Sequence, residues 1–374
     1  MKFTILVQPY MRSRGEGRTP ELPGRDRGRF SRVLERLTEQ MQFADEAGYD
    51  GMCMTEQHMQ VEGIEVTTNP LLYGLFVAQH TKNLRVGQLG IPLTTRNPIA
   101  VAEDLALADH FTNGRLFCGF SRGNTPRWAE TFAQHLGLTS ATSDKSAQDV
   151  ANREAFYEAW HIIKSLWTDD LTAIDGRFWK VPVQTTHWDW KPTNEWGRGV
   201  DDSYALKEVG IVPRPLQDPY PPVYAPFAFS MESARFWARE GGKLVSFVPK
   251  DDFVKTTIDV YQAEAADVGR KVSPADALAI GAHLVMANDE RAVDDLMVGF
   301  TELFDFAYDT PPYNVPMGRV FKGIGAEVAE QVARLNGELG VEEFVLWHHV
   351  GYFDHAQELE MLDVFASSVI GKFR

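Results

Sequence analysis

The fold is decided by the stretch YDGMCMTEQH, residues 49–58. A helical pattern ends just before it at Ala47-Gly48, a short apolar run follows, and four polar residues from Thr55 to His58 come where the run stops. A buried strand that carries polar side chains at its C-terminal end is typical of α/β barrels. The same pattern recurs at residues 115–124, 222–230 and 342–349. We interpret all four segments as strands of one barrel, with their polar ends directed at one site.

Strands and helices alternate along the rest of the chain. Besides the run that ends before Thr55, strands are predicted at residues 2–8, 84–91, 115–120, 223–228, 243–248, 278–286 and 342–349. Helices are predicted at residues 30–47, 69–80, 98–111, 152–167, 231–240, 251–268, 289–300, 325–339 and 355–370. Strict alternation calls for parallel strands joined by right-handed crossovers. The fold class is therefore α/β, and the architecture is a (β/α)8 TIM barrel.

The length of 374 residues fits one barrel with insertions, so we predict a single domain over residues 1–374. Irregular segments at about residues 9–29, 180–206 and 305–320 are expected as inserted loops at the C-terminal face of the barrel, where they would form a lid. Tryptophans at 188, 190 and 196 lie in or near the second insertion. Their rings either cover an apolar substrate or only anchor the insertion.

Charge and cysteine content exclude several classes of protein. The net charge is −15 and no run is rich in Lys or Arg, which argues against nucleic-acid binding. A bound phosphate must instead be met locally by one or two arginines and backbone N–H groups. The two cysteines, Cys53 and Cys118, lie in apolar runs and cannot make a disulfide framework, so a reducing cytoplasm is expected. We expect no export signal and no membrane span.

Two segments place candidate proton-handling residues at strand ends. His58, beside Glu56, either exchanges protons near neutral pH or only orients a loop. Glu56 fits better as a buried hydrogen-bond partner than as a proton shuttle. His348 and His349 end the last strand, and only one of them can face inward because side chains alternate along a strand.

A phosphate site is predicted after the fourth and fifth strands. Arg122 lies in FSRGNTP, where its guanidinium offers a fork to a phosphate or caps a helix at the surface. Ser230 and Ser233 start the helix after the fifth strand, where they form an anion site or only cap the helix. Adjacent strands would present these three residues to the same phosphate. Thr94, after the third strand, is predicted as a further cofactor-binding residue.

Other kinds of site lack their sequence signals. There is no HExxH, no CxxC and no clustered Asp/Glu/His triplet, so no metal site is predicted. No Ser or Cys lies in a nucleophile elbow, and the Gly-rich stretch GRGVDD lacks the strand-to-helix context of a dinucleotide-binding motif.

Four separated blocks resemble the bacterial luciferase-like flavin monooxygenases, in the order found in that family. The blocks are AGYDGMCMTEQH (47–58), VGQLGIPLTTRNPIAVAEDLALADHFTNGRLFCGFSRG (86–123), VPRPLQDPYPPVYAPFAFSMESARFWAREG (212–241) and LGVEEFVLW (339–347). The resemblance covers most of the chain and implies a barrel that binds FMN, or in one branch the deazaflavin F420, and that works as a homodimer. It also places Arg122, Ser230 and Ser233 where family members hold the flavin phosphate.

The resemblance implies catalytic roles near the flavin for His58, Gln57 and Glu56. The family pattern has two histidines after the second strand, and here the first is replaced by Gln57. The chain therefore departs from luciferases themselves, in which that first histidine is catalytic. The expected activity is that of a two-component monooxygenase, which takes reduced FMN from a separate NAD(P)H:flavin reductase and uses O2 to oxygenate a small organic substrate. Aromatic residues at 188, 190, 227, 229, 313 and 347 favour an apolar or aromatic substrate, although core packing explains them as well.

Two alternatives stay open at this point. The first is hydride transfer with F420, whose long acidic tail finds no obvious basic groove in this acidic chain. The second is a flavin-binding protein without turnover, suggested by Gln57.

Overall fold

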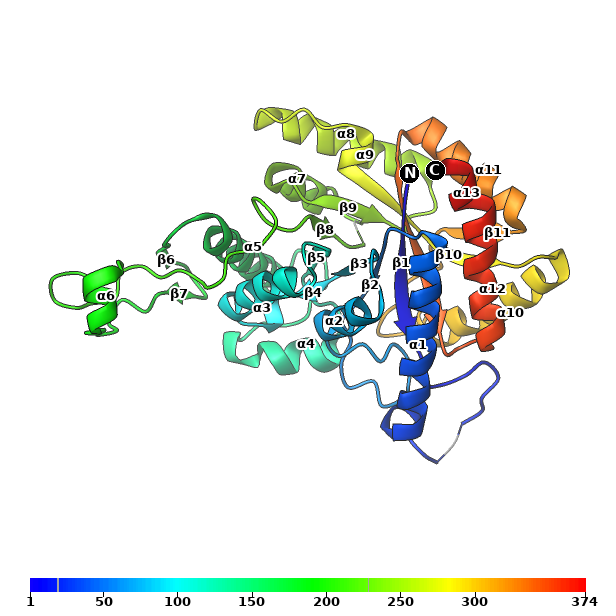
Figure 1. Cartoon of the computed structure of the whole chain (residues 1–374), viewed down its shortest axis with the longest axis horizontal. Helices are drawn as coiled ribbons and strands as arrows, with labels where there is room; N and C mark the ends of the chain where they lie inside the picture. The colour runs from blue at the N-terminus through cyan, green and yellow to red at the C-terminus, as the bar shows by residue number, and fades with distance from the viewer. Residues whose placement is uncertain (19, 228) are drawn as a thin grey trace. The chain divides into compact units, whose positions relative to one another are not determined.

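The main sheet closes on itself into a barrel (Figure 1). A computed structural model describes residues 1–18, 20–227 and 229–374. In the ring, β1 pairs in parallel with both β2 and β12, and β9 pairs with β10. The strands of the ring are β1 (Lys2–Pro9), β2 (Gly51–Met54), β3 (Arg85–Gln88), β5 (Leu116–Ser121), β8 (Val223–Ala225), β9 (Lys243–Ser246), β10 (Leu278–Met286) and β12 (Glu343–Val350). The predicted (β/α)8 TIM barrel is confirmed.

The chain divides into two compact units. The first comprises residues 1–91, 117–120 and 222–374, and it contains most of the barrel. The second comprises residues 92–116 and 121–221. Two short strands join the main sheet beside the ring: β4 (Ile91–Pro92) pairs with β5, and β11 (Val320–Gly323) pairs with β10 beyond the stretch where β10 pairs with β9.

The barrel interior is packed by rings that need glycines on neighbouring strands. All residues of β10 and β12 are buried, as expected for parallel strands covered on both faces. A Cβ atom added at Gly87 would lie 2.3 Å from the ring of Phe117, so this ring fills the place of a side chain on β3. Tyr224 donates to Glu343 at 2.8 Å, and Lys243 contacts the same carboxylate at 2.7 Å. This carboxylate therefore has a phenol and an ammonium group as partners.

Helices cover the barrel of the first unit. α1 (Arg27–Ala47) begins where the side chain of Asp26 accepts from the amide of Arg29, and it ends at Gly48 with a left-handed φ of 88°. The other helices are α2 (Pro70–His80), α7 (Met231–Glu240), α8 (Asp251–Asp267), α9 (Pro274–Ala277), α10 (Glu290–Ala307), α11 (Gly325–Leu339), α12 (His355–Phe365) and α13 (Gly371–Phe373). The two termini lie at one end of this unit (Figure 1), and the amino group of Met1 is 3.4 Å from the carbonyl oxygen of Phe373.

The second unit is mainly helical. It contains α3 (Pro98–Phe111), α4 (Pro126–Ala133), α5 (Ala147–Thr168) and α6 (Lys191–Trp196). β6 (Ile174–Asp175) and β7 (Lys180–Val181) form a short antiparallel pair. Trp160 and Trp167 of α5 are buried, and their rings pack edge to face.

Several predicted boundaries are wrong, each for a local reason. α5 begins at Ala147 instead of residue 152, because Ser146 caps it by accepting from the amide of Asp149. α10 continues to Ala307, past the predicted end at residue 300, because its apolar face stays buried through Phe304. β8 ends at Ala225, and the predicted strand end at Ala228 lies outside the described residues. The segment 180–206 was predicted as irregular but includes α6.

Candidate functional site

The end of β2 brings Glu56 and His58 together. The strand is buried, so the polar residues that follow it start from a fixed point at the barrel mouth, the C-terminal end of the ring. Glu56 is buried, and its Oε1 atom lies 2.8 Å from Nε2 of His58. A carboxylate at this distance holds the imidazole in one orientation and favours the proton on Nε2. The amide of Gln57 donates to the carbonyl oxygen of Thr67 at 3.0 Å, which fixes this loop to the segment that carries Glu65.

The two histidines at the end of β12 point to opposite sides of the sheet. His348 reaches the helix layer, where its Nε2 lies 2.9 Å from Oε1 of Gln40 on α1. His349 pairs in register with Gln8, and its ring lies 5.3 Å from that of Tyr10. His349 is therefore the histidine that faces inward. Burial lowers the pKa of His348 to about 3 and also holds the pKa of His349 well below its usual value. Both rings are neutral at physiological pH.

Three buried rings form a stack inside the barrel. Trp347 lies 4.4 Å from His283 and 6.1 Å from His349, measured between ring centroids, and both pairs are stacked. Burial lowers the pKa of His283 to about 3. Among the described residues, Nδ1 of His283, Nε1 of Trp347 and both ring nitrogens of His349 have no hydrogen-bond partner. Buried polar atoms are normally paired, so these nitrogens suit a ligand or water that both donates and accepts hydrogen bonds.

A buried chain of hydroxyl groups lies next to this stack. The hydroxyls of Tyr10 and Tyr308 are hydrogen-bonded to one another, and that of Tyr308 is 2.8 Å from Oε1 of Glu65. All three side chains are buried. Sequence reasoning missed this chain. Tyr10 directly follows β1 and so obeys the strand-end rule used for His58, whereas Glu65 and Tyr308 lie in connecting segments that carry no sequence signal.

Ser230 and Ser233 lie at the N-terminus of α7. The Ser230 Oγ atom accepts from the amide of Ser233 at 3.2 Å and lies 3.0 Å from the Ser233 Oγ atom. Ser230 is therefore a helix cap, as one of the two interpretations of the sequence proposed. The positive end of the helix dipole at this position also suits an anion.

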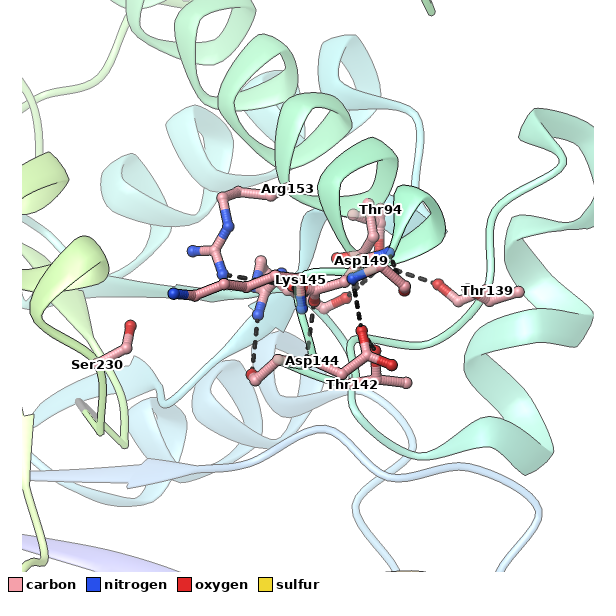
Figure 2. A network of polar contacts seen from close by, with 12 residues as sticks. Thr94, Thr139, Thr142, Asp144, Lys145, Asp149, Arg153 and Ser230 are labelled. Carbon is pink, nitrogen blue, oxygen red and sulfur yellow. Dashed lines mark hydrogen bonds and ion pairs between the residues drawn. The ribbon is translucent and has the colours of Figure 1, made fainter.

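Arg122 belongs to a polar network in the second unit, of which Figure 2 labels Thr94, Asp149 and Arg153. Its Nη1 atom donates to Asp149 at 2.9 Å, and its Nη2 atom donates to the hydroxyl of Ser143 at 3.2 Å. Arg153 lies 3.7 Å from the same carboxylate, which also accepts from the amides of Ser143 and Lys145. Burial alone would raise the pKa of Asp149, but the Ser143 amide and the Arg122 guanidinium outweigh it and lower the pKa. The ionised carboxylate holds two guanidinium groups in place.

The main chain at Arg122 is held as firmly as its side chain. The Thr94 hydroxyl donates to the Arg122 carbonyl oxygen at 2.8 Å, and the Asn152 amide donates to the same oxygen at 3.3 Å. Thr94 is buried, so its contact in the described structure is with the Arg122 loop. Sequence reasoning found Arg122 and Thr94 but missed Asp149, Ser143 and Arg153, because no motif links them to Arg122.

The predicted phosphate-binding residues belong to different units. Arg122 and Thr94 lie in the second unit, and Ser230 and Ser233 lie in the first. The joint binding of one phosphate by these residues stays a prediction.

No helix in the described ranges is long and apolar enough to cross a bilayer. Across residues 1–18, 20–227 and 229–374, no group of three or more His, Cys, Asp or Glu side chains is arranged to hold a metal ion. Cys53 and Cys118 are both buried, and burial raises the pKa of the Cys53 thiol well above its usual value.

Comparison with known proteins gives consistent matches. The family model for luciferase-like monooxygenases matches residues 1–344. The alkanal monooxygenase alpha chain of Photorhabdus laumondii subsp. laumondii is 28% identical over 158 residues, which cover 41% of this chain and 40% of that protein. The chain spans 52% of one further curated relative and about two fifths of several others.

Solved structures share the fold over the full chain. The oxygenating constituent of 3,6-diketocamphane monooxygenase from Pseudomonas putida, in complex with FMN, has a TM-score of 0.73 at 18% identity and covers 100% of this chain and 99% of its own. An F420-dependent secondary alcohol dehydrogenase has a TM-score of 0.61 at 15% identity and covers 99% of this chain and 98% of its own. At these identities the likeness shows the fold alone. Because the family model matches most of the sequence, the chain belongs to the luciferase-like monooxygenase family.

Proposed function

We propose that the protein is the oxygenase component of a two-component monooxygenase that uses reduced FMN and O2 to oxygenate a small apolar or aromatic molecule. Family membership supports the reaction class. The observation that carries the FMN assignment is the network in which Asp149 holds both Arg122 and Arg153. With the charges of Lys145 and Asp144, this network has three cations against two carboxylates. This local excess of positive charge is enough to bind a compact phosphate group.

The residues present fit a bound flavin. Arg122, Ser230 and Ser233 would hold its phosphate, and Thr94 would keep the Arg122 loop in place. When bound, reduced FMN supplies the electrons that activate O2. Glu56 orients His58, and His58 and Gln57 would hydrogen-bond near the flavin or substrate. The rings around Trp347 would exclude water, which protects reactive species from hydrolysis.

The proposal also includes partners. A separate NAD(P)H:flavin reductase would supply reduced FMN, in line with the name of the Pseudomonas putida structure, which describes an oxygenating constituent. A homodimer in the cytoplasm is the expected form of the protein. The substrate would be small, because aromatic rings fill much of the barrel interior.

Hydride transfer with F420 is the second candidate, supported by the fold shared with an F420-dependent alcohol dehydrogenase. Anaerobic titration of the purified protein with reduced FMN and with F420, followed by measurement of O2 uptake, separates the candidates. Tight binding of reduced FMN with O2 consumption supports the monooxygenase. Binding of F420 without O2 uptake supports the dehydrogenase, and flavin binding without turnover of any added substrate supports a carrier.

A further inference from the structure

The buried chain Tyr10, Tyr308 and Glu65 joins three separate elements of the first unit. Tyr10 follows β1, Glu65 lies in the segment after β2, and Tyr308 follows α10. The hydroxyl of Tyr308 lies between the other two groups, 2.8 Å from Glu65 and in hydrogen-bond contact with Tyr10. Tyr10 is 1% exposed, Glu65 4% and Tyr308 5%, so bulk water cannot replace these contacts.

The protonation state of Glu65 controls which directions the hydrogen bonds of the chain can take. Each phenol carries one proton. When Glu65 is ionised, Tyr308 donates to it, and Tyr10 must then donate to Tyr308. When Glu65 is protonated, its O–H can donate to Tyr308 instead, which allows Tyr308 to donate to Tyr10 and frees the proton of Tyr10 for another acceptor. The ring next to Tyr10 is His349, 5.3 Å away between centroids, which lines the barrel interior.

Glu65 is built to change its protonation near neutral pH. Burial raises the pKa of Glu65 to about 7, against the lowering effect of the hydrogen bond from Tyr308. Its backbone has a φ of 51°, a region that residues other than glycine seldom adopt. Val66 donates to the carbonyl oxygen of Pro9 at 3.0 Å, which fixes the strained residue against the end of β1. A strained, buried carboxyl group at a barrel mouth is a mark of function.

We propose that Glu65, Tyr308 and Tyr10 form a proton relay in which Glu65 stores a proton and Tyr10 delivers it to a molecule bound in the barrel mouth. The inference rests on the proposed function, because an oxygenase must place a proton on the oxygen atom that leaves as water. One turn of the relay moves one proton from Glu65 to Tyr308, one from Tyr308 to Tyr10, and one from Tyr10 to the bound molecule. Glu65 is left ionised and takes its next proton from solvent.

In the part of the chain that the structure describes, the titratable side chains that face the relay are one histidine and two tyrosines. Tyr10 faces His349 of β12 and Tyr352 of the following loop, and Tyr308 faces Tyr313. The charges that act on Tyr352 are those of Glu302, Arg14 and Arg12. Burial keeps the pKa of His349 low and raises that of Tyr352, so neither neighbour changes charge near pH 7.

The first test follows the stored proton itself. Infrared difference spectra of the whole protein, taken from about pH 5 to about pH 9, should show a protonated carboxyl band that titrates near neutral pH. Burial also raises the pKa of Glu358 to about 8, so this carboxyl contributes a band in the same pH range in both proteins. The component due to Glu65 should be absent in Glu65→Gln, which keeps an oxygen for Tyr308 to bond but holds no titrating proton. Identical carboxyl titrations in the wild type and in Glu65→Gln would overturn the proposal.

The second test follows proton delivery. Photoreduced FMN bound to the protein is mixed with O2, and the rate of flavin oxidation is measured against pH in H2O and D2O. The wild type should show an inflection near neutral pH and a solvent isotope effect. Tyr10→Phe should lose both and slow at least tenfold, and Glu65→Gln should lose the inflection.

A matched control variant and a binding measurement distinguish failure of the relay from failure of the proposed function. Tyr352→Phe removes a neighbouring phenol that bonds to the Gly299 carbonyl and not to the relay, so it should behave like the wild type. If all variants bind and oxidise reduced FMN with the wild-type pH profile, the relay is overturned and the oxygenase stands. If the wild-type protein does not bind reduced FMN, the proposed function fails, and the carboxyl titration alone then decides whether the relay exists.

Discussion

The Arg122 guanidinium group is held by the carboxylate of Asp149, and we expect its removal to weaken flavin binding. Arg122→Ala should weaken the binding of reduced FMN at least tenfold, because about 1.5–3 kcal/mol is lost with a charged hydrogen-bonding fork. The affinity of Arg122→Lys for reduced FMN should lie between those of the wild type and Arg122→Ala, because lysine keeps the positive charge but lacks the paired N–H donors of the guanidinium group. Anaerobic fluorescence titration measures the dissociation constants. Arg177→Ala, which removes an exposed arginine paired with Glu154, is the control. Unchanged affinity in a folded Arg122→Ala protein would remove the phosphate assignment.

Asp149 should matter for stability as well as for binding. Its buried carboxylate forms ion pairs with Arg122 and Arg153, and Asp149→Asn would remove the negative charge that both guanidinium groups contact. The free energy of unfolding should drop by about 2–3 kcal/mol, measured by urea denaturation. Asp144→Asn changes an exposed carboxylate nearby and should leave the urea midpoint almost unmoved. Equal midpoints for the two variants would show that the network does not support the fold.

Glu65 should make the protein less stable as the pH rises. Its folded pKa of about 7 lies above the unfolded value of 4.5, so the folded state binds the extra proton. Stability is therefore greatest below the unfolded value and is lost as the pH rises from there to the folded value, by at most about 3 kcal/mol for this one group. Glu65→Gln should flatten this part of the curve and gain stability relative to the wild type above neutral pH. Urea denaturation across this pH range measures both slopes, and parallel slopes for the two proteins would contradict the assignment.

At the scale of elements, two glycines in different settings should respond oppositely to the same change. Gly87→Ala on β3 would put a Cβ atom 2.3 Å from the Phe117 ring, so it should destabilise the barrel by about 1–3 kcal/mol. Gly337→Ala on α11 meets nothing within 4 Å and should stabilise the protein by about 0.5–1 kcal/mol through helix propensity. Thermal and urea denaturation of both variants give the signs. A neutral Gly87→Ala would show that β3 and β5 shift apart easily.

The elements best predicted from sequence are the buried strands. β10 and β12 are buried on both faces, and apolar residues make up most of their sequences, LAIGAHLVM and EFVLWHHV, which indicates a strand without any tertiary information. α4 was missed because it has only eight residues, of which Pro126 is the first, and the start of α5 was misplaced because the cap at Ser146 lies in a polar stretch. Short elements and helix ends depend on single hydrogen bonds, which periodicity does not report.

For the site residues, contacts between positions close in the sequence could be predicted, whereas contacts between distant positions could not. Glu56 and His58 are two positions apart, so their contact could be predicted from the strand end alone. Tyr308 and Glu65 are 243 positions apart, and Tyr308 and Tyr10 are 298 apart, so only the closed fold brings them together. Asp149 lies 27 positions from Arg122, beyond any local motif. Sequence shows which residues end a strand, whereas contacts between distant segments need the structure.

At the scale of the whole molecule, the source of the reduced flavin should not matter. If reduced FMN reaches the protein by diffusion, photoreduced FMN without a reductase should support the same O2 uptake per reduced flavin as any unrelated FMN reductase. Oxygen-electrode measurements at matched concentrations of reduced FMN check this. Activity with one particular reductase only would indicate direct transfer within a complex and would require a docking surface.

The pairing of β1 with β12 has a consequence for how the chain is made. Residues 2–9 are synthesised long before residues 343–350, which are their partners on one side. Until then, the first strand carries an unsatisfied edge that can pair with the wrong neighbour. This pairing also joins residues that are more than three hundred positions apart in the sequence, which slows folding. Synthesis at low temperature or with added chaperones should therefore raise the yield of active protein.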